Sequence, residues 1–230
     1  MKRDQRALSA VPAWLWAVLG AALAAQLAWQ GAPRSTESDS MALAPAPSVQ
    51  SLRLASFGER EALARILALH IQSFDLRRDY APLVGWLRSS LDLDPRSSYP
   101  LFLAARVYAE SPDPARVRLA LDFVYQEFFR DPDRRWPWLA HAALVAKHRL
   151  GDLPLARRYA SAVQRYATSP EVPLWAKQME IFILEDMNEL TAAKIMLGGL
   201  LESGTIHDPA ERRFLEQRLQ ELEARTGGAR

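Results

Sequence analysis

Cysteine is absent from the 230-residue chain. Its absence excludes a disulfide framework, a thiolate zinc site, an iron–sulfur cluster and a cysteine nucleophile. The chain also lacks a glycine-rich phosphate loop and the H-E-x-x-H and G-x-S-x-G motifs. Of its four histidines, His141 and His148 are seven residues apart, beyond the i, i+4 spacing of a chelating pair on a helix. We therefore predict that the chain is not an enzyme and has no catalytic residue, no cofactor and no metal site.

An excess of charge of one sign is missing as well. The net charge is +2, and the first ten residues account for it, because Lys2, Arg3 and Arg6 outweigh Asp4. The remaining 26 basic and 26 acidic residues cancel. A neutral body has no general electrostatic attraction to nucleic acid. We therefore expect no nucleic-acid partner.

One long apolar run is present near the N-terminus. Residues 11–29 contain no charged side chain, and as a helix they would extend about 28 Å, which is close to the hydrocarbon thickness of a bilayer. Trp14 and Trp16 lie near one end of this run and Trp29 at the other, where amphipathic rings favour the lipid–water boundary. We predict a transmembrane anchor inserted in the lipid bilayer. The alternative is a cleaved signal peptide, with residues 22–24 as its cleavage site.

The charges that flank this run predict its orientation. The segment before it is basic, whereas Arg34 is opposed by Glu37 and Asp39 in the segment after it. The positive-inside rule then places the N-terminus in the cytoplasm and the C-terminal body across the membrane. We predict a single-pass protein of the bacterial inner membrane with a periplasmic body.

A change of composition after the apolar run suggests the domain boundaries. Residues 31–55 are rich in proline, serine and alanine and show no periodicity, which is typical of a flexible linker. The predicted organisation is a cytoplasmic tip and anchor at residues 1–30 and a flexible linker at 31–55. A repeat region follows at 56–207, and a capping helix with a tail at 208–230.

Helical periodicity begins at the end of the linker. Ser56 and Glu59 have the spacing of a capping box, and apolar residues follow at helical spacing at Leu63, Ile66, Leu67, Ile71 and Phe74. No later segment alternates with period two, and the prolines gather where helices would begin or end. We therefore predict an all-α fold.

The helical region repeats with a period of 36–37 residues. Leu83, Ala120, Ala156 and Ala193 occupy one equivalent column. Small residues at three of these positions would let the two helices of a hairpin approach closely. Bulkier apolar residues follow each member of the column, at Trp86, Phe123, Tyr159 and Met196. Because each hairpin has one apolar face that it cannot bury alone, we predict that the hairpins stack.

Two segments carry a family resemblance. Residues 78–95, which end in Leu-Asp-Pro, and residues 151–160 resemble the second helix of a tetratricopeptide (TPR) repeat. The resemblance covers residues 60–203 and implies a right-handed helix-hairpin solenoid of about four TPR-like repeats, closed by a C-terminal capping helix. The periods are longer than the family's 34 residues, and Ser111–Pro114 adds a turn. A neighbouring helical-repeat class with the same solenoid is the alternative.

The resemblance implies a concave groove formed by the first helix of each pair. It places these residues in the groove: Tyr99, Trp138 and Trp175 in one column, Phe102, His141 and Gln178 in the next, Arg106, Val145 and Phe182 in a third, and His148 and Arg149 at one end. Aromatic rings beside arginines suit an extended peptide or an amphipathic helix, but local packing of the same rings is an equal alternative. The family's carboxylate clamp is absent, since Ala68 and Gln72 occupy its first-repeat positions.

These features predict a membrane-anchored, periplasm-facing adaptor. It would bind protein or peptide partners through its groove during export, envelope assembly or complex maturation. The layout is similar to that of single-span repeat proteins that accompany the secretion translocon and cytochrome assembly. The alternative is a structural subunit or self-assembling scaffold of a membrane complex, in which the chain would form homo-oligomers.

Overall fold

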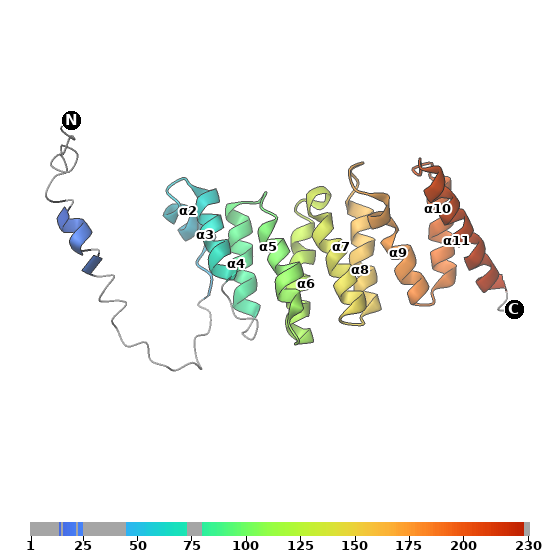
Figure 1. Ribbon diagram of the computed structural model, residues 1–230, viewed down its shortest axis with the longest axis horizontal. Coiled ribbons are helices and arrows are strands. Elements are labelled where there is room, and N and C mark those ends of the chain that lie inside the picture. Colours follow the sequence, from blue (N-terminus) through green and yellow to red (C-terminus); the bar gives the residue numbers. More distant parts are fainter. Residues whose placement is uncertain (1–13, 15, 22, 25–44, 73–79, 228–230) are drawn as a thin grey trace, which may run out of the picture. The chain divides into compact units, whose positions relative to one another are not determined.

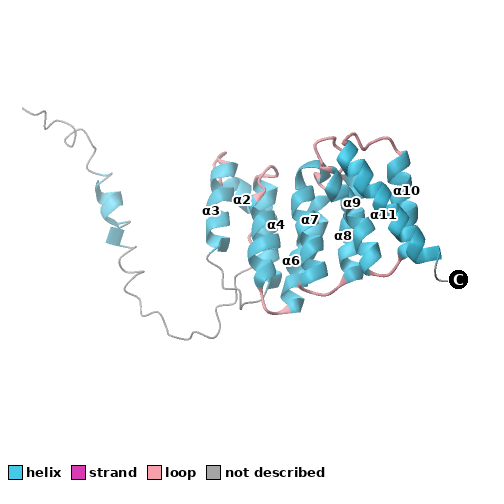
Figure 2. Cartoon of the chain, turned by 45° about the vertical axis from the view of Figure 1, so that its right-hand side comes forward, coloured by secondary structure: helices cyan, strands magenta, loops and turns pink. Residues whose placement is uncertain are grey.

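The computed structural model describes residues 14, 16–21, 23–24, 45–72 and 80–227. Every regular element in these residues is a helix and none is a strand, so the predicted all-α fold is confirmed for this part of the chain (Figure 2). The chain divides into two compact units, residues 1–41 and 42–230. In the first unit, the described residues are helical.

The predicted anchor at residues 11–29 is only partly described, and both of its ends lie outside the described residues. Among the residues that are described, no helix is both long enough and apolar enough to cross a bilayer. Most of the predicted linker, up to residue 44, also lies outside them. The anchor and its orientation therefore stay predictions.

The second unit is a succession of helices that pack on neighbours close in the chain, with α2 against α4 and the later helices in consecutive pairs (Figure 1). Its α-helices have these bounds: α2 Val49–Ala55, α3 Arg60–Gln72, α4 Tyr80–Leu93, α5 Tyr99–Phe102, α6 Pro114–Phe128, α7 Pro132–His148, α8 Leu153–Tyr166, α9 Leu174–Asp186, α10 Leu190–Glu202 and α11 Pro209–Gly227. Helix α5 continues through a π-helical turn, Leu103–Val107, and a 3-10 turn, Tyr108–Glu110. The pairs α3–α4, α5–α6, α7–α8 and α9–α10 form hairpins, and α11 packs on α10.

Local sequence signals explain where several helices begin. Pro114, Pro132 and Pro209 are each the first residue of a helix, where a missing N–H costs little. The Asp113 carboxylate accepts the Ala115 N–H at 2.9 Å, and the Asp152 carboxylate accepts the Leu155 N–H at 3.0 Å. These aspartates therefore cap α6 and α8.

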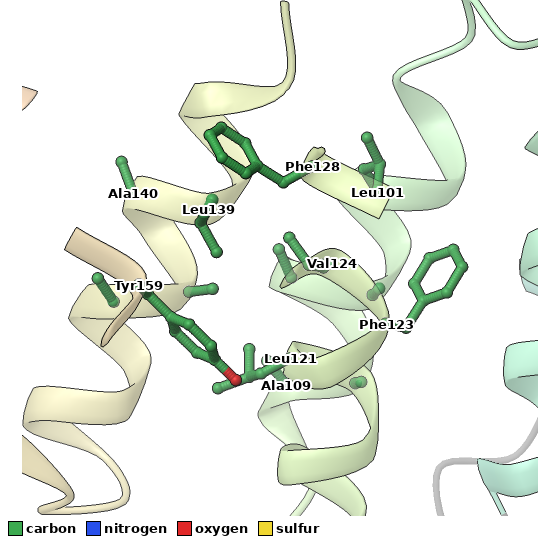
Figure 3. Packing of buried hydrophobic residues seen from close by; sticks show 14 of the residues in the cluster. Leu101, Ala109, Leu121, Phe123, Val124, Phe128, Leu139, Ala140 and Tyr159 are labelled. Carbon is green, nitrogen blue, oxygen red and sulfur yellow. The ribbon is translucent and has the colours of Figure 1, made fainter. Parts of the chain in front are cut away.

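The predicted column of small residues lies in the interior. Leu83, Ala120, Ala156 and Ala193 are each at most 1% exposed. Of the bulkier residues that follow them, Phe123 and Tyr159 are buried, while Trp86 and Met196 are half-buried. Side chains of successive helices, including Leu101, Val124 and Leu139, meet in the layer between the second and third hairpins (Figure 3).

The packed structure begins before the predicted boundary at residue 56. Residues 49–55, which we expected in the flexible linker, form α2, and Leu52 is buried against Leu67 and Leu93. The capping-box prediction is wrong, because Ser56 ends α2 and its hydroxyl donates to the Arg53 carbonyl at 2.7 Å.

One residue of the expected apolar stripe on α3 faces outward. Ile66 is 61% exposed, whereas Leu67 and Ile71 are buried. Among the described residues of the second unit, α2 is the only helix before α3, and it packs on α4. No hairpin formed by the described residues of this unit therefore covers the side of α3 that carries Ile66.

Polar contacts link equivalent positions of successive hairpins. They join residues 36–40 positions apart, close to one repeat. Arg130 donates to Asp92 at 2.8 Å, and Arg158 donates to Asp122 at 3.1 Å. These separations lie within a few residues of the period of the apolar column, so the polar and the apolar contacts both join one hairpin to the next.

The close approach of helices at the small-residue column gives a stability prediction. We expect Ala156→Leu to lower the free energy of unfolding by about 1–3 kcal/mol, because the added atoms overpack a filled interface. The exposed Ala62 is the matched control, and Ala62→Leu should stay within about 0.5 kcal/mol of the wild type. Urea unfolding of the full chain, followed by circular dichroism, measures both. Equal effects of the two substitutions would contradict the interior placement.

Candidate functional site

Three aromatic rings form a continuous row on the first helices of the second and third hairpins. Tyr99 and Phe102 stack on α5 with ring centroids 5.8 Å apart, and Phe102 meets Trp138 of α7 edge-on at 5.8 Å. The Tyr99 hydroxyl donates to the Gln72 side-chain oxygen at 2.9 Å, which links the row to α3. All three rings are half-buried. We call Tyr99, Phe102 and Trp138 the aromatic ladder.

A hollow of about 310 Å³ lies at the α3 end of the ladder. Its lining consists of Ala64, Arg65, Ala68 and Leu69 of α3 together with Asp94, Ser97 and Tyr99. The two alanines are buried, and Leu69 is 65% exposed. We call this feature the α3 hollow, and its alanines and Leu69 make it largely apolar.

The α3 hollow was not predicted from the sequence, in which Ala68 and Gln72 stand only at positions where a carboxylate clamp is absent. In the structure Ala68 is buried, and Gln72 accepts the Tyr99 hydroxyl. One sequence signal did point to the hollow: Leu69 is an apolar residue of α3 that the predicted inward stripe leaves out.

Arg149, a predicted groove residue, joins the third hairpin to the second. Its guanidinium donates to the Glu110 carboxylate at 2.6 Å and to the carbonyl oxygens of Glu110 and Ser111 at 2.6 and 2.9 Å. Three hydrogen bonds hold this side chain against the end of the first helix of the second hairpin, where Glu110 lies. The structure therefore gives Arg149 a role in packing the hairpins.

His141 lies half-buried on α7, while Arg106 and His148 are exposed. Burial lowers the pKa of His141 below its usual value, and the positive charge of Arg106 lowers it further. The Glu110 carboxylate acts in the opposite direction. His141 is therefore neutral at pH 7 and presents an uncharged ring beside Arg106.

The predicted residues on α9 do not extend the aromatic ladder. Trp175 is 52% exposed and contacts Trp136 edge-on at 5.6 Å. Gln178 is buried, and its amide donates to the Glu211 carboxylate of α11 at 2.9 Å. Phe182 is half-buried. The predicted column of Tyr99, Trp138 and Trp175 thus forms two separate ring clusters, and Gln178 packs α9 on α11.

The described residues form no cluster of side chains that could hold a metal ion. Within them, no three histidine or acidic side chains lie close enough together to serve as ligands. The arrangement of the first helices is instead that of a contact surface, with an apolar hollow, partly exposed rings and a few exposed polar side chains. Such a surface can bind apolar side chains of a partner.

The lowered pKa of His141 gives a pH prediction. As the pH falls through about 6.5, the ordinary pKa of histidine, the unfolded chain binds more protons at this position than the folded chain, whose pKa is lower. The free energy of unfolding therefore decreases as the pH is lowered. We expect His141→Gln to lose less stability than the wild type on acidification, as measured by urea unfolding at each pH. Leu144→Gln, which adds the same side chain at an exposed position of the same helix without removing a titratable group, should keep the wild-type dependence on pH. A wild-type curve for His141→Gln would contradict the prediction.

Comparison with known proteins gave no match to a protein-family model, a curated protein or a solved structure. On the first helices of the pairs, the aromatic ladder with the α3 hollow is the surface best suited to bind a partner.

Proposed function

We propose that the chain is a membrane-anchored adaptor whose helix pairs form a right-handed, TPR-like solenoid. Helix pairs that recur every 36–37 residues, with a buried small-residue column and contacts between equivalent positions, support this proposal. In such a solenoid the first helices of the pairs line one surface. Helix α11, with its charged outer surface, would then cap the C-terminal end.

The proposal keeps residues 11–29 as the anchor, with the N-terminus in the cytoplasm and the helical body in the periplasm. The charge-free run and the basic residues before it support this orientation. An adaptor held in this way would bring its partners to the inner membrane during export, envelope assembly or complex maturation.

The α3 hollow beside the aromatic ladder is the observation that carries the proposed binding activity. Leu69 is largely exposed at the mouth of an apolar hollow, and burying such a side chain would contribute about 1.5–3 kcal/mol. The volume of about 310 Å³ lies in the usual range of ligand pockets, about 300–1,000 Å³. We propose that an apolar side chain of a peptide or helix inserts here and that the segment continues along the ladder.

Arg149 and Gln178 are not part of the proposed surface, because both side chains are held by contacts between helices. Trp175 belongs to a separate cluster with Trp136. The surface proposed for partner binding therefore consists of the α3 hollow and the aromatic ladder, with Arg106 and His141 farther along.

A photo-crosslinking amino acid placed at position 69 tests this function in cells that make the full chain. We expect a discrete adduct with another protein, because the side chain at this position would lie against the bound segment. The matched control is position 195, where Ile195 is 68% exposed on α10, far along the chain from the hollow. Adducts are detected by electrophoresis and identified by mass spectrometry.

The pattern of adducts distinguishes the two candidate functions, the adaptor and the self-assembling scaffold. An adduct at position 69 that is absent at position 195 supports the adaptor. Equal adducts at both positions would reflect general apolar contact and would contradict a specific site. An adduct with twice the mass of the chain would instead favour the self-assembling scaffold.

A further inference from the structure

A second hollow, of about 390 Å³, lies over helices α6 and α8. Three aromatic residues form one side of it. Tyr125 and Phe129 have ring centroids 5.0 Å apart, and Phe129 and Tyr166 have centroids 5.2 Å apart, both pairs in edge-on geometry. Phe129 is 41% and Tyr166 52% exposed. We call this feature the second-helix hollow, because α6 and α8 are the second helices of their hairpins.

Three arginines of α8 line the same hollow. Arg157 pairs with the buried Glu180 at 3.3 Å. Arg158 pairs with Asp122 at 3.1 Å, and its guanidinium lies 4.6 Å from the centre of the Tyr125 ring. Both guanidinium groups are therefore held in place before any ligand arrives.

Arg165 differs from its two neighbours. It is exposed and forms no ion pair within the part of the chain that the structure describes. Three arginines face two carboxylates here, so the hollow carries an excess of positive charge at its open side. An uncompensated guanidinium beside exposed rings is a recognition site for a carboxylate with an adjoining apolar group.

We propose that the second-helix hollow binds an acidic segment of a protein partner. One carboxylate of that segment pairs with Arg165, and a neighbouring apolar side chain packs against the exposed parts of the Phe129 and Tyr166 rings. The lining is concave, so it accepts a protruding side chain, whereas the surface of a bilayer is flat. This site lies on different helices from the α3 hollow and does not depend on it.

Binding of defined probes to the full chain in detergent micelles tests the proposal. The probe is a short fluorescent peptide with glutamates on both sides of a central leucine, and fluorescence anisotropy measures its affinity. We expect the peptide to bind. Its affinity should fall as the salt concentration is raised, because salt screens the ion pair between the peptide carboxylate and Arg165. The matched peptide with glutamine in place of glutamate should bind at least about tenfold more weakly.

The variant Arg165→Glu should weaken binding of the acidic peptide by about tenfold or more, because attraction becomes like-charge repulsion. The matched control is Arg213→Glu on α11, since Arg213 is also exposed and forms no ion pair among the described residues. This control changes the net charge equally and should bind as the wild type does. Tyr166→Ala should cause a smaller loss, and circular dichroism verifies that all variants are folded.

Three outcomes would overturn the proposal. Equal affinity for the glutamate and glutamine peptides would remove the role of charge. Equal weakening by Arg165→Glu and Arg213→Glu would show a general charge effect and no specific site. Binding to vesicles of anionic lipid without binding to the acidic peptide would assign the hollow to a membrane surface instead of a protein segment.

Discussion

The structure depends on one constraint: each helix pair has an apolar face that it cannot bury by itself. Small side chains at Ala120 and Ala156 allow helices to approach closely, and the large rings of Phe123 and Tyr159 fill the remaining space. Stacking removes these faces from water and supplies most of the driving force for folding. The same requirement explains why apolar side chains remain exposed on α3, because the described residues of the second unit place only the short helix α2 before the first pair, and α2 packs on α4.

Arginine fixes the register in which the pairs stack. Arg135 is buried, and its guanidinium donates to the carbonyl oxygens of Glu127 and Pro95 at 2.6 and 3.0 Å and pairs with the Glu127 carboxylate. Arg149 likewise reaches a carboxylate and two carbonyl oxygens of the preceding hairpin. A planar group with several fixed donors can satisfy such mixed acceptors, whereas a lysine ammonium is a point charge. The 25 arginines against 4 lysines in the chain therefore have a structural use at these positions.

The sequence was sufficient to predict the helices of the pairs and the spacing of the pairs, because both follow from local periodicity and from the positions of the prolines near helix ends. It did not predict features that depend on neighbouring elements. Ser56 has the spacing of a capping box, but it closes α2, whose Leu52 finds a buried position only in the folded chain. Gln178 lies on the predicted groove side, yet it turns to Glu211 because α11 packs beside α9.

The location of the two hollows follows from the same architecture. The α3 hollow forms beside the first helices, where small residues of α3 lie under an exposed Leu69. The second-helix hollow forms over α6 and α8, where Phe129 and Tyr166 meet across the pairs. One surface is apolar and the other combines rings with positive charge, so they suit segments of different chemistry. In the adaptor that we propose, these two surfaces on different helices would hold two partners at once.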